Sequence, residues 1–161
     1  MKIVLSRKAG RARMTCWRAD GTSTGADLGP SLPGHDLAHY VVEKTLRLPS
    51  GFFVHVARGY SIQQLSDAAT IRSLGTEPLI AEVLARALGE TATGACTCEQ
   101  FPERVAAELR QLKVSVPEGI SAETAERMRG ELEQLMRRFG ELGHGESMEL
   151  DFPVPPFLSP R

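Results

Sequence analysis

The sequence predicts a single α+β domain, with a small antiparallel sheet made by both ends of the chain and packed with about five helices. Residues 2–7 and 12–18 alternate weakly in polarity and flank a turn, as in a β-hairpin. Residues 146–152 alternate more clearly, which predicts a third strand. Between these ends, apolar residues recur at helical spacing. We therefore expect the domain to cover residues 1–152, followed by a proline-rich tail at 153–161.

Length and composition fit an ordinary globular protein. The 161 residues suffice to bury a core without disulfides, and 42% hydrophobic residues are typical of such domains. A formal net charge of -1 makes a strongly basic nucleic-acid binder unexpected. No apolar run approaches the roughly 18 residues that span a bilayer, and charges at Lys2, Arg7 and Lys8 interrupt any secretory signal. We expect no membrane partner and a cytoplasmic location.

The cysteine content favours free thiols. Cys16, Cys96 and Cys98 are an odd number, which fits a reducing compartment better than a disulfide framework. Cys96 and Cys98 could contribute to a thiolate metal site, but their spacing differs from that of zinc knuckles. The prediction is three free cysteines.

The N-terminal hairpin is basic, with six basic side chains and no acidic one in the first eighteen residues. One interpretation is an anion or nucleic-acid contact, and the other is a set of charges that protects a sheet edge. The acidic residues Glu149 and Asp151 of the C-terminal strand favour the second, because opposite charges pair across adjacent strands. We expect that strand to join the hairpin in one antiparallel sheet.

The middle of the chain predicts helices joined by short loops. Residues 19–34 are rich in glycine and polar residues and indicate a connecting loop. A helix should follow from Pro33 or His35 to Leu46, and the apolar run at 51–57 favours a short buried helix.

Four more helices are expected downstream. A capping box at Ser61–Gln64 predicts a helix that continues to about Arg72. The next should run from Pro78 to about Leu88 and end at Gly89, before a loop at residues 90–95. The last two are expected to begin near Pro102, at the first turn, and after Ser121, as an N-cap.

The central helix carries the candidate functional residues. His35, His39 and Glu43 follow one another at intervals of four, so they share one helix face, opposite the apolar stripe of the same helix. Imidazole nitrogens and a carboxylate oxygen at this spacing could hold a divalent metal ion, with zinc among the candidates. Asp36 lies beside them as a further ligand or a general base. The sequence thus predicts a metal-binding protein, with hydrolysis as one activity that such a site could support.

Two alternatives remain open at this stage. The polar helix face could be solvated, in a non-catalytic interaction module or a homo-oligomer. His55, inside the apolar run at 51–57, could be either a buried histidine hydrogen-bonded to backbone or a third metal ligand.

The segment His35–His39 resembles the His-Glu-x-x-His helix of zinc metallopeptidases, with Asp36 in place of the glutamate. The resemblance implies His35 and His39 as zinc ligands and Asp36 as the base that activates a metal-bound water. The shorter aspartate holds its carboxylate about one methylene further from that water. The longer run from His35 to Phe53 is also similar to small bacterial proteins of unknown function, a resemblance that implies no activity.

Overall fold

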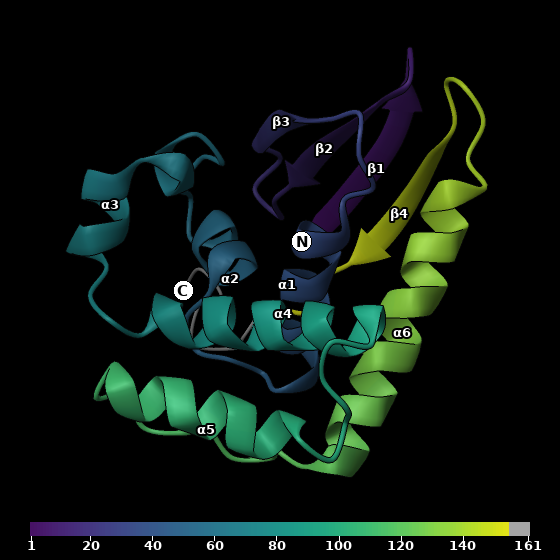
Figure 1. The fold of residues 1–161 in the computed structure, drawn as a ribbon. Helices are drawn as coiled ribbons and strands as arrows, with labels where there is room; N and C mark the ends of the chain where they lie inside the picture. Colours follow the sequence, from purple (N-terminus) through teal and green to yellow (C-terminus); the bar gives the residue numbers. More distant parts are fainter. Residues whose placement is uncertain (155–161) are drawn as a thin grey trace.

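The computed structural model describes residues 1–154, so most of the predicted tail at 153–161 lies outside the described residues. The described chain folds into a four-stranded antiparallel sheet and six α-helices, which confirms the predicted α+β class. Figure 1 shows the sheet in the upper part of the view, α1 below it and behind α4, and α6 beside β4. Within residues 1–154, no helix combines the length and the apolar character that crossing a bilayer requires.

The sheet joins both ends of the chain, as predicted. Its strand order is β3-β2-β1-β4, so the N-terminal strand lies in the middle, between its hairpin partner and the C-terminal strand. Ile3 lies opposite Cys16 on one side and Leu150 on the other, and all three side chains face the core. The strands are β1 (Lys2–Lys8), β2 (Arg11–Trp17), β3 (Ser23–Gly29) and β4 (Ser147–Asp151).

Basic side chains of the hairpin pair within the sheet. Lys2 Nζ lies 2.8 Å from the Glu149 carboxylate on β4, as the cross-strand charge pattern predicted. Arg11 binds Asp27 on β3 in the same way, at 2.9 Å. Arg18 donates to the carbonyl oxygens of Val56 and Tyr60, both at 2.7 Å, and so ties the end of β2 to the chain around α2.

Strand β3 corrects the prediction of a loop at 19–34. Its sequence is polar and glycine-rich and has no alternating pattern, because an edge strand needs no apolar face to pair with its neighbour. Gly25 allows β3 to lie close to β2, since a Cβ at this position would be 3.0 Å from the Met14 carbonyl oxygen on β2.

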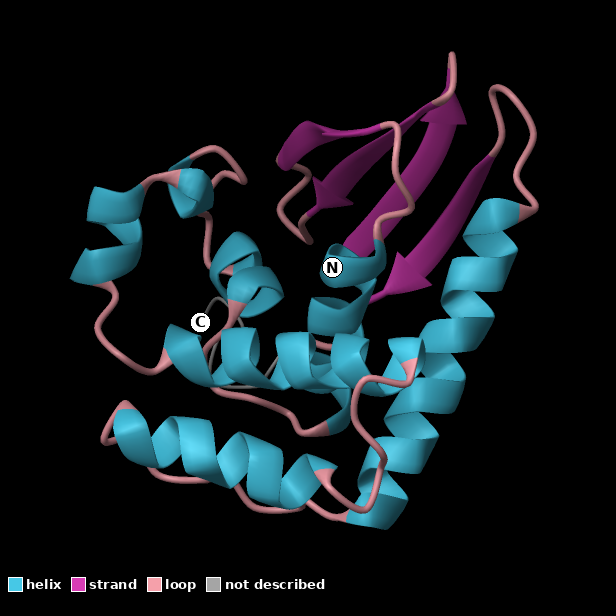
Figure 2. Ribbon diagram, in the orientation of Figure 1, coloured by secondary structure: helices cyan, strands magenta, loops and turns pink. Residues whose placement is uncertain are grey.

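The helices follow the predicted order along the chain, and Figure 2 shows them in cyan with the strands in magenta. The helix at the centre, the short helix in the apolar run and the long helix capped by Ser121 all form, and the Ser121 side chain accepts from the Thr124 amide. The helical elements are α1 (Gly34–Thr45), α2 (Phe52–Ala57), the 3₁₀-helix η1 (Gln64–Ser66), α3 (Ala68–Ser73), α4 (Pro78–Thr93), α5 (Phe101–Gln111) and α6 (Ala122–Gly140).

Two predicted helix boundaries are wrong. Ser61 and Gln64 do exchange the hydrogen bonds of a capping box, but the helix they begin is only the 3₁₀-turn η1. Asp67 then starts α3 separately by accepting from the Thr70 amide. Helix α4 runs through Gly89 into the predicted loop and ends at Gly94, whose φ of 77° is the left-handed conformation that glycine adopts readily.

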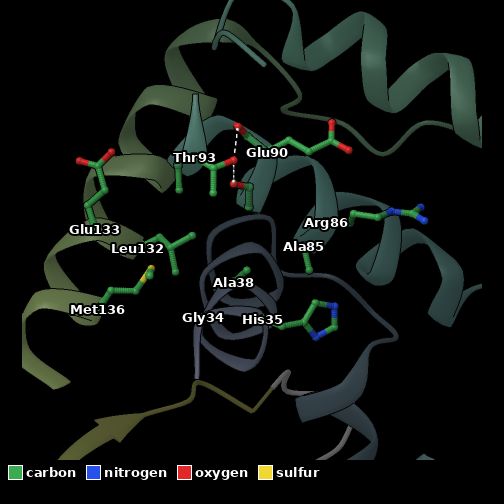
Figure 3. Close-up of a pocket in the computed structure, with 12 residues that line it drawn as sticks. Gly34, His35, Ala38, Ala85, Arg86, Glu90, Thr93, Leu132, Glu133 and Met136 are labelled. Atoms are coloured by element: carbon green, nitrogen blue, oxygen red, sulfur yellow. Dashed lines mark hydrogen bonds between the residues drawn. The ribbon is translucent and has the colours of Figure 1, made fainter. Parts of the chain in front are cut away.

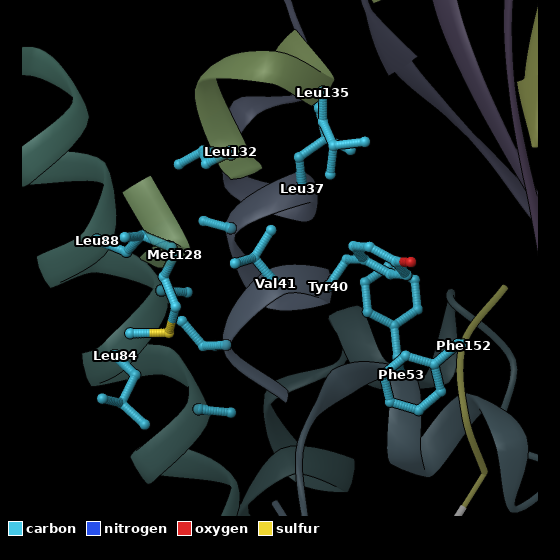
Figure 4. Packing of buried hydrophobic residues seen from close by; sticks show 14 of the residues in the cluster. Leu37, Tyr40, Val41, Phe53, Leu84, Leu88, Met128, Leu132, Leu135 and Phe152 are labelled. Carbon is cyan, nitrogen blue, oxygen red and sulfur yellow. The ribbon is translucent and has the colours of Figure 1, made fainter. Parts of the chain in front are cut away.

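Helix α1 lies in the core and contacts α2, α4 and α6. Leu37 and Val41 pack among residues of α4 and α6, while Tyr40 lies near Phe53 and Phe152 (Figure 4). Every residue from Leu37 to Glu43 is buried. Because neighbouring elements cover the helix on several sides, the polar face is solvated only in part: His39 and Glu43 are buried, whereas His35 is exposed.

Candidate metal centre

Three side chains from two helices converge at the surface between α1 and α4. His35 and His39 lie on successive turns of α1, and Glu82 comes from α4. The Glu82 carboxylate has one oxygen 3.3 Å from His35 Nε2 and the other 3.1 Å from His39 Nε2. One ligand atom from each residue lies within 4.8 Å of the other two, so these residues could hold a metal ion together.

Local sequence explains why these side chains meet. The two histidines are four residues apart on one helix, so their rings meet edge to face on one side of it, with centroids 4.8 Å apart. Pro78 begins α4, and Glu82 follows about one turn later, where α4 packs against α1. Glu82 is the only acidic residue between Pro78 and Gly89, and this lone acid in an apolar stretch is the sequence signal that could have identified it.

Glu43 lies beside the group and is not a member of it. Its carboxylate is 3.1 Å from His39 Nδ1, whereas Glu82 binds the other ring nitrogen, Nε2. The second Glu43 oxygen accepts from the Val54 amide at 3.1 Å, and Glu43 is only 1% exposed. Of the three predicted ligands, the structure therefore brings His35 and His39 together and places Glu43 behind His39. The third member of the group, Glu82, was not predicted.

Gly51 makes room for the Glu43 carboxylate. A Cβ atom at Gly51 would lie 2.4 Å from Glu43 Cδ, closer than any real side chain can approach. The chain between α1 and α2 thus closes directly over the carboxylate. This contact and the Val54 hydrogen bond fix the position of Glu43, which in turn fixes the His39 ring.

The charges of the group are strongly coupled. Burial alone would lower the pKa of His39, but hydrogen bonds and charge interactions with Glu43 and Glu82 outweigh it and raise the pKa to about 9. Hydrogen bonds with His35 and His39 hold the pKa of Glu82 well below its usual range. In the metal-free protein, His39 is therefore an imidazolium at neutral pH and donates to both carboxylates.

A pocket of about 340 Å³ borders the three side chains, and we call it the histidine pocket. Asp36 also lines it, and burial raises the pKa of its carboxyl group. No hydrogen bond within residues 1–154 joins Asp36 to His35, His39 or Glu82, so its role as a general base stays a prediction. The lining residues are His35, Asp36, His39, Gly51, Phe52, His55, Leu65, Ile71, Leu74, Pro78, Leu79 and Glu82.

His55 lines the same pocket but is outside the His–His–Glu group. It is buried, and its Nε2 lies 2.9 Å from the Ser50 hydroxyl, so its partner is a side chain rather than the expected backbone group. Its Nδ1 has no hydrogen-bond partner among the described residues.

His35 also borders a second cavity, of about 570 Å³, shown in Figure 3. Apolar lining comes from Ala38 of α1, Ala85 of α4, and Leu132 and Met136 of α6.

The three cysteines are buried and free, as predicted, and none belongs to the metal-ligand group found among residues 1–154.

Comparison with known proteins adds no assignment. No protein-family model, curated protein or solved structure matches this chain. The resemblance of His35–His39 to the metallopeptidase helix and that of the longer run to bacterial proteins therefore stay predictions.

The contact between Gly51 and Glu43 predicts that adding one methyl group at Gly51 lowers the stability of the protein. Gly51→Ala should lower the free energy of unfolding by about 1–3 kcal/mol, because the added Cβ forces the buried carboxylate to move. Urea unfolding measures the change. Gly130→Ala is the matched control, since a Cβ there meets nothing within 4 Å on the exposed face of α6. It should stabilise by roughly 0.5–1 kcal/mol, and equal effects of both substitutions would contradict the prediction.

The raised pKa of His39 predicts that the free energy of unfolding of the metal-free protein depends on pH. The folded-state pKa of about 9 exceeds the ordinary value of 6.5, so protonation of His39 stabilises the fold. The contribution of this protonation to the free energy of unfolding is fully present below pH 6.5 and is lost as the pH rises through 9. The shift in pKa corresponds to a contribution of about 3 kcal/mol. Urea unfolding with a chelator at pH 6, 7.5 and 9 measures it. His39→Gln should flatten the trend, and parallel pH profiles for variant and wild type would overturn the assignment.

Proposed function

We propose that this protein binds one divalent transition-metal ion, with zinc the first candidate, through His35, His39 and Glu82. The observation that carries the proposal is the convergence of their ligand atoms within 4.8 Å. Two ligands at about 2.0–2.1 Å from a tetrahedral ion lie about 3.3 Å apart. One Glu82 oxygen lies 3.3 Å from His35 Nε2 and the other lies 3.1 Å from His39 Nε2, so each of these two pairs is close to this value.

The surroundings of His39 support the proposal independently. Metal-binding histidines commonly donate their second ring N–H to a carboxylate, which fixes the tautomer and the ring orientation. Glu43 is held in that position by Val54 and Gly51. With Nδ1–H donating to Glu43, loss of the Nε2 proton on metal binding frees the Nε2 lone pair on the side of Glu82.

The donor set also indicates which kind of metal site this is. Structural zinc sites use four protein ligands, whereas two imidazoles and one carboxylate are the ligands of some catalytic zinc sites. Three protein ligands leave a position for water or a bound molecule. The histidine pocket borders the three ligands and provides space for such a molecule.

Metal analysis of untagged protein tests the proposal. Wild-type protein loaded with zinc and then desalted should retain about one ion per chain, and Glu82→Gln and His39→Ala should fall to background. His144→Ala is the matched control, because His144 is exposed in the loop before β4 and is the one histidine outside both the group and the pocket. Equal trace metal in wild type and in Glu82→Gln would reject the site and would leave Glu82 as the ion-pair partner of a protonated His39.

The role of Glu43 predicts a graded effect rather than complete loss. Glu43→Gln keeps the size of the side chain and an acceptor for His39 but removes the negative charge. Zinc affinity should fall about 10–100-fold while the stoichiometry stays near one, as expected for an outer carboxylate of a metal-binding histidine. Competition with a chromophoric chelator measures the affinity. Unchanged affinity would show that Glu43 serves packing alone.

A further inference from the structure

The histidine pocket has an apolar side that a metal ion would not use. This side is lined by Phe52 of α2, Leu65 of η1 and Leu79 of α4. These side chains share the cavity with His35, His39 and Glu82, so a molecule bound there would meet polar ligands and apolar surface together. The volume of about 340 Å³ lies at the lower end of the range for small-molecule sites.

The region of α3 contributes two apolar side chains to the pocket, Ile71 and Leu74, of which Leu74 also packs against the core. None of the residues of α3 is buried. Ile71 is 37% exposed. Large apolar side chains left exposed around a concavity mark ligand-contacting surface, because burial by a ligand is what would remove them from water.

The charges around the pocket disfavour an anionic ligand. No lysine or arginine is among its lining residues, whereas the acidic residues Asp36 and Glu82 both are. The charge of a divalent ion would be offset by the adjacent carboxylates of Glu43 and Glu82. Burial, together with the positive charge of Arg58, lowers the pKa of His55 and so favours its neutral imidazole.

We propose that the histidine pocket binds a small, uncharged, largely apolar molecule that coordinates the metal through a single lone-pair donor. The donor atom takes the coordination position left by His35, His39 and Glu82, and the apolar body contacts Ile71 and Leu79. This inference rests on the proposed metal site and deepens it by naming the class of ligand.

Titration of the full-length protein loaded with Co²⁺ tests the inference, with the visible absorption of the metal as the readout. The probes are imidazole, 4-phenylimidazole and benzoate. Imidazole and 4-phenylimidazole coordinate through the same neutral nitrogen, and the added ring should make binding at least about tenfold tighter, since each buried methylene-sized group contributes about fourfold. Benzoate carries a similar ring on an anionic donor and should bind more weakly than 4-phenylimidazole.

A matched pair of variants locates the apolar contact. Ile71→Ser should reduce the preference for 4-phenylimidazole over imidazole at least about threefold. Leu112→Ser should leave it unchanged, because Leu112 has the same exposed fraction, 37%, but follows α5 and is not among the pocket residues. Both substitutions remove an exposed apolar side chain, so a difference between them reports the pocket rather than general stability.

The outcomes separate this inference from the metal site. If Co²⁺ binds stoichiometrically, three results would overturn the ligand class and leave the metal site standing. They are equal affinity for imidazole and 4-phenylimidazole, tighter binding of benzoate than of 4-phenylimidazole, and an unchanged ratio of the two imidazole affinities in Ile71→Ser. Failure to bind Co²⁺ or zinc at all would overturn the proposed function and this inference with it.

Discussion

The buried carboxylate of Glu43 is the contact on which the arrangement of the candidate site depends. It joins the His39 ring to the Val54 amide, and so connects α1 with the first turn of α2. An ionised carboxylate is costly to bury unless hydrogen bonds and opposite charge compensate it. The chain meets this requirement with the imidazolium of His39, a backbone amide and the space left by Gly51. Each of these partners is thereby held in one position.

The fold was predictable wherever the pattern is local. The hairpin, β4 and most helix starts follow from alternation, capping residues and proline, all of which act within a few positions. Strand β3 was missed because its residues carry no such pattern and become a strand only by pairing with β2. The end of α4 was misplaced for a related reason: Gly89 is tolerated inside the helix because packing of Leu88 and Thr91 continues on either side of it.

The site was predictable only in part. The spacing of His35 and His39 on one helix is local information, whereas Glu82 is 43 positions beyond His39 and reaches it through the packing of α4 on α1. A helical wheel correctly puts Glu43 on the same face as His39, yet it does not show which ring nitrogen the carboxylate meets. Nor does it show burial, because the elements that cover α1 lie elsewhere in the sequence.

The position of β1 in the middle of the sheet has a consequence for how the protein is made. During synthesis, β1 and β2 can pair early, but the other edge of β1 stays open until residues 147–151 have left the ribosome. Contacts between residues so far apart in the chain form slowly, since a long loop must close first. The edge of β1 that β4 covers therefore stays unpaired while residues 9–146 are synthesised, and the acidic β4 then completes the sheet.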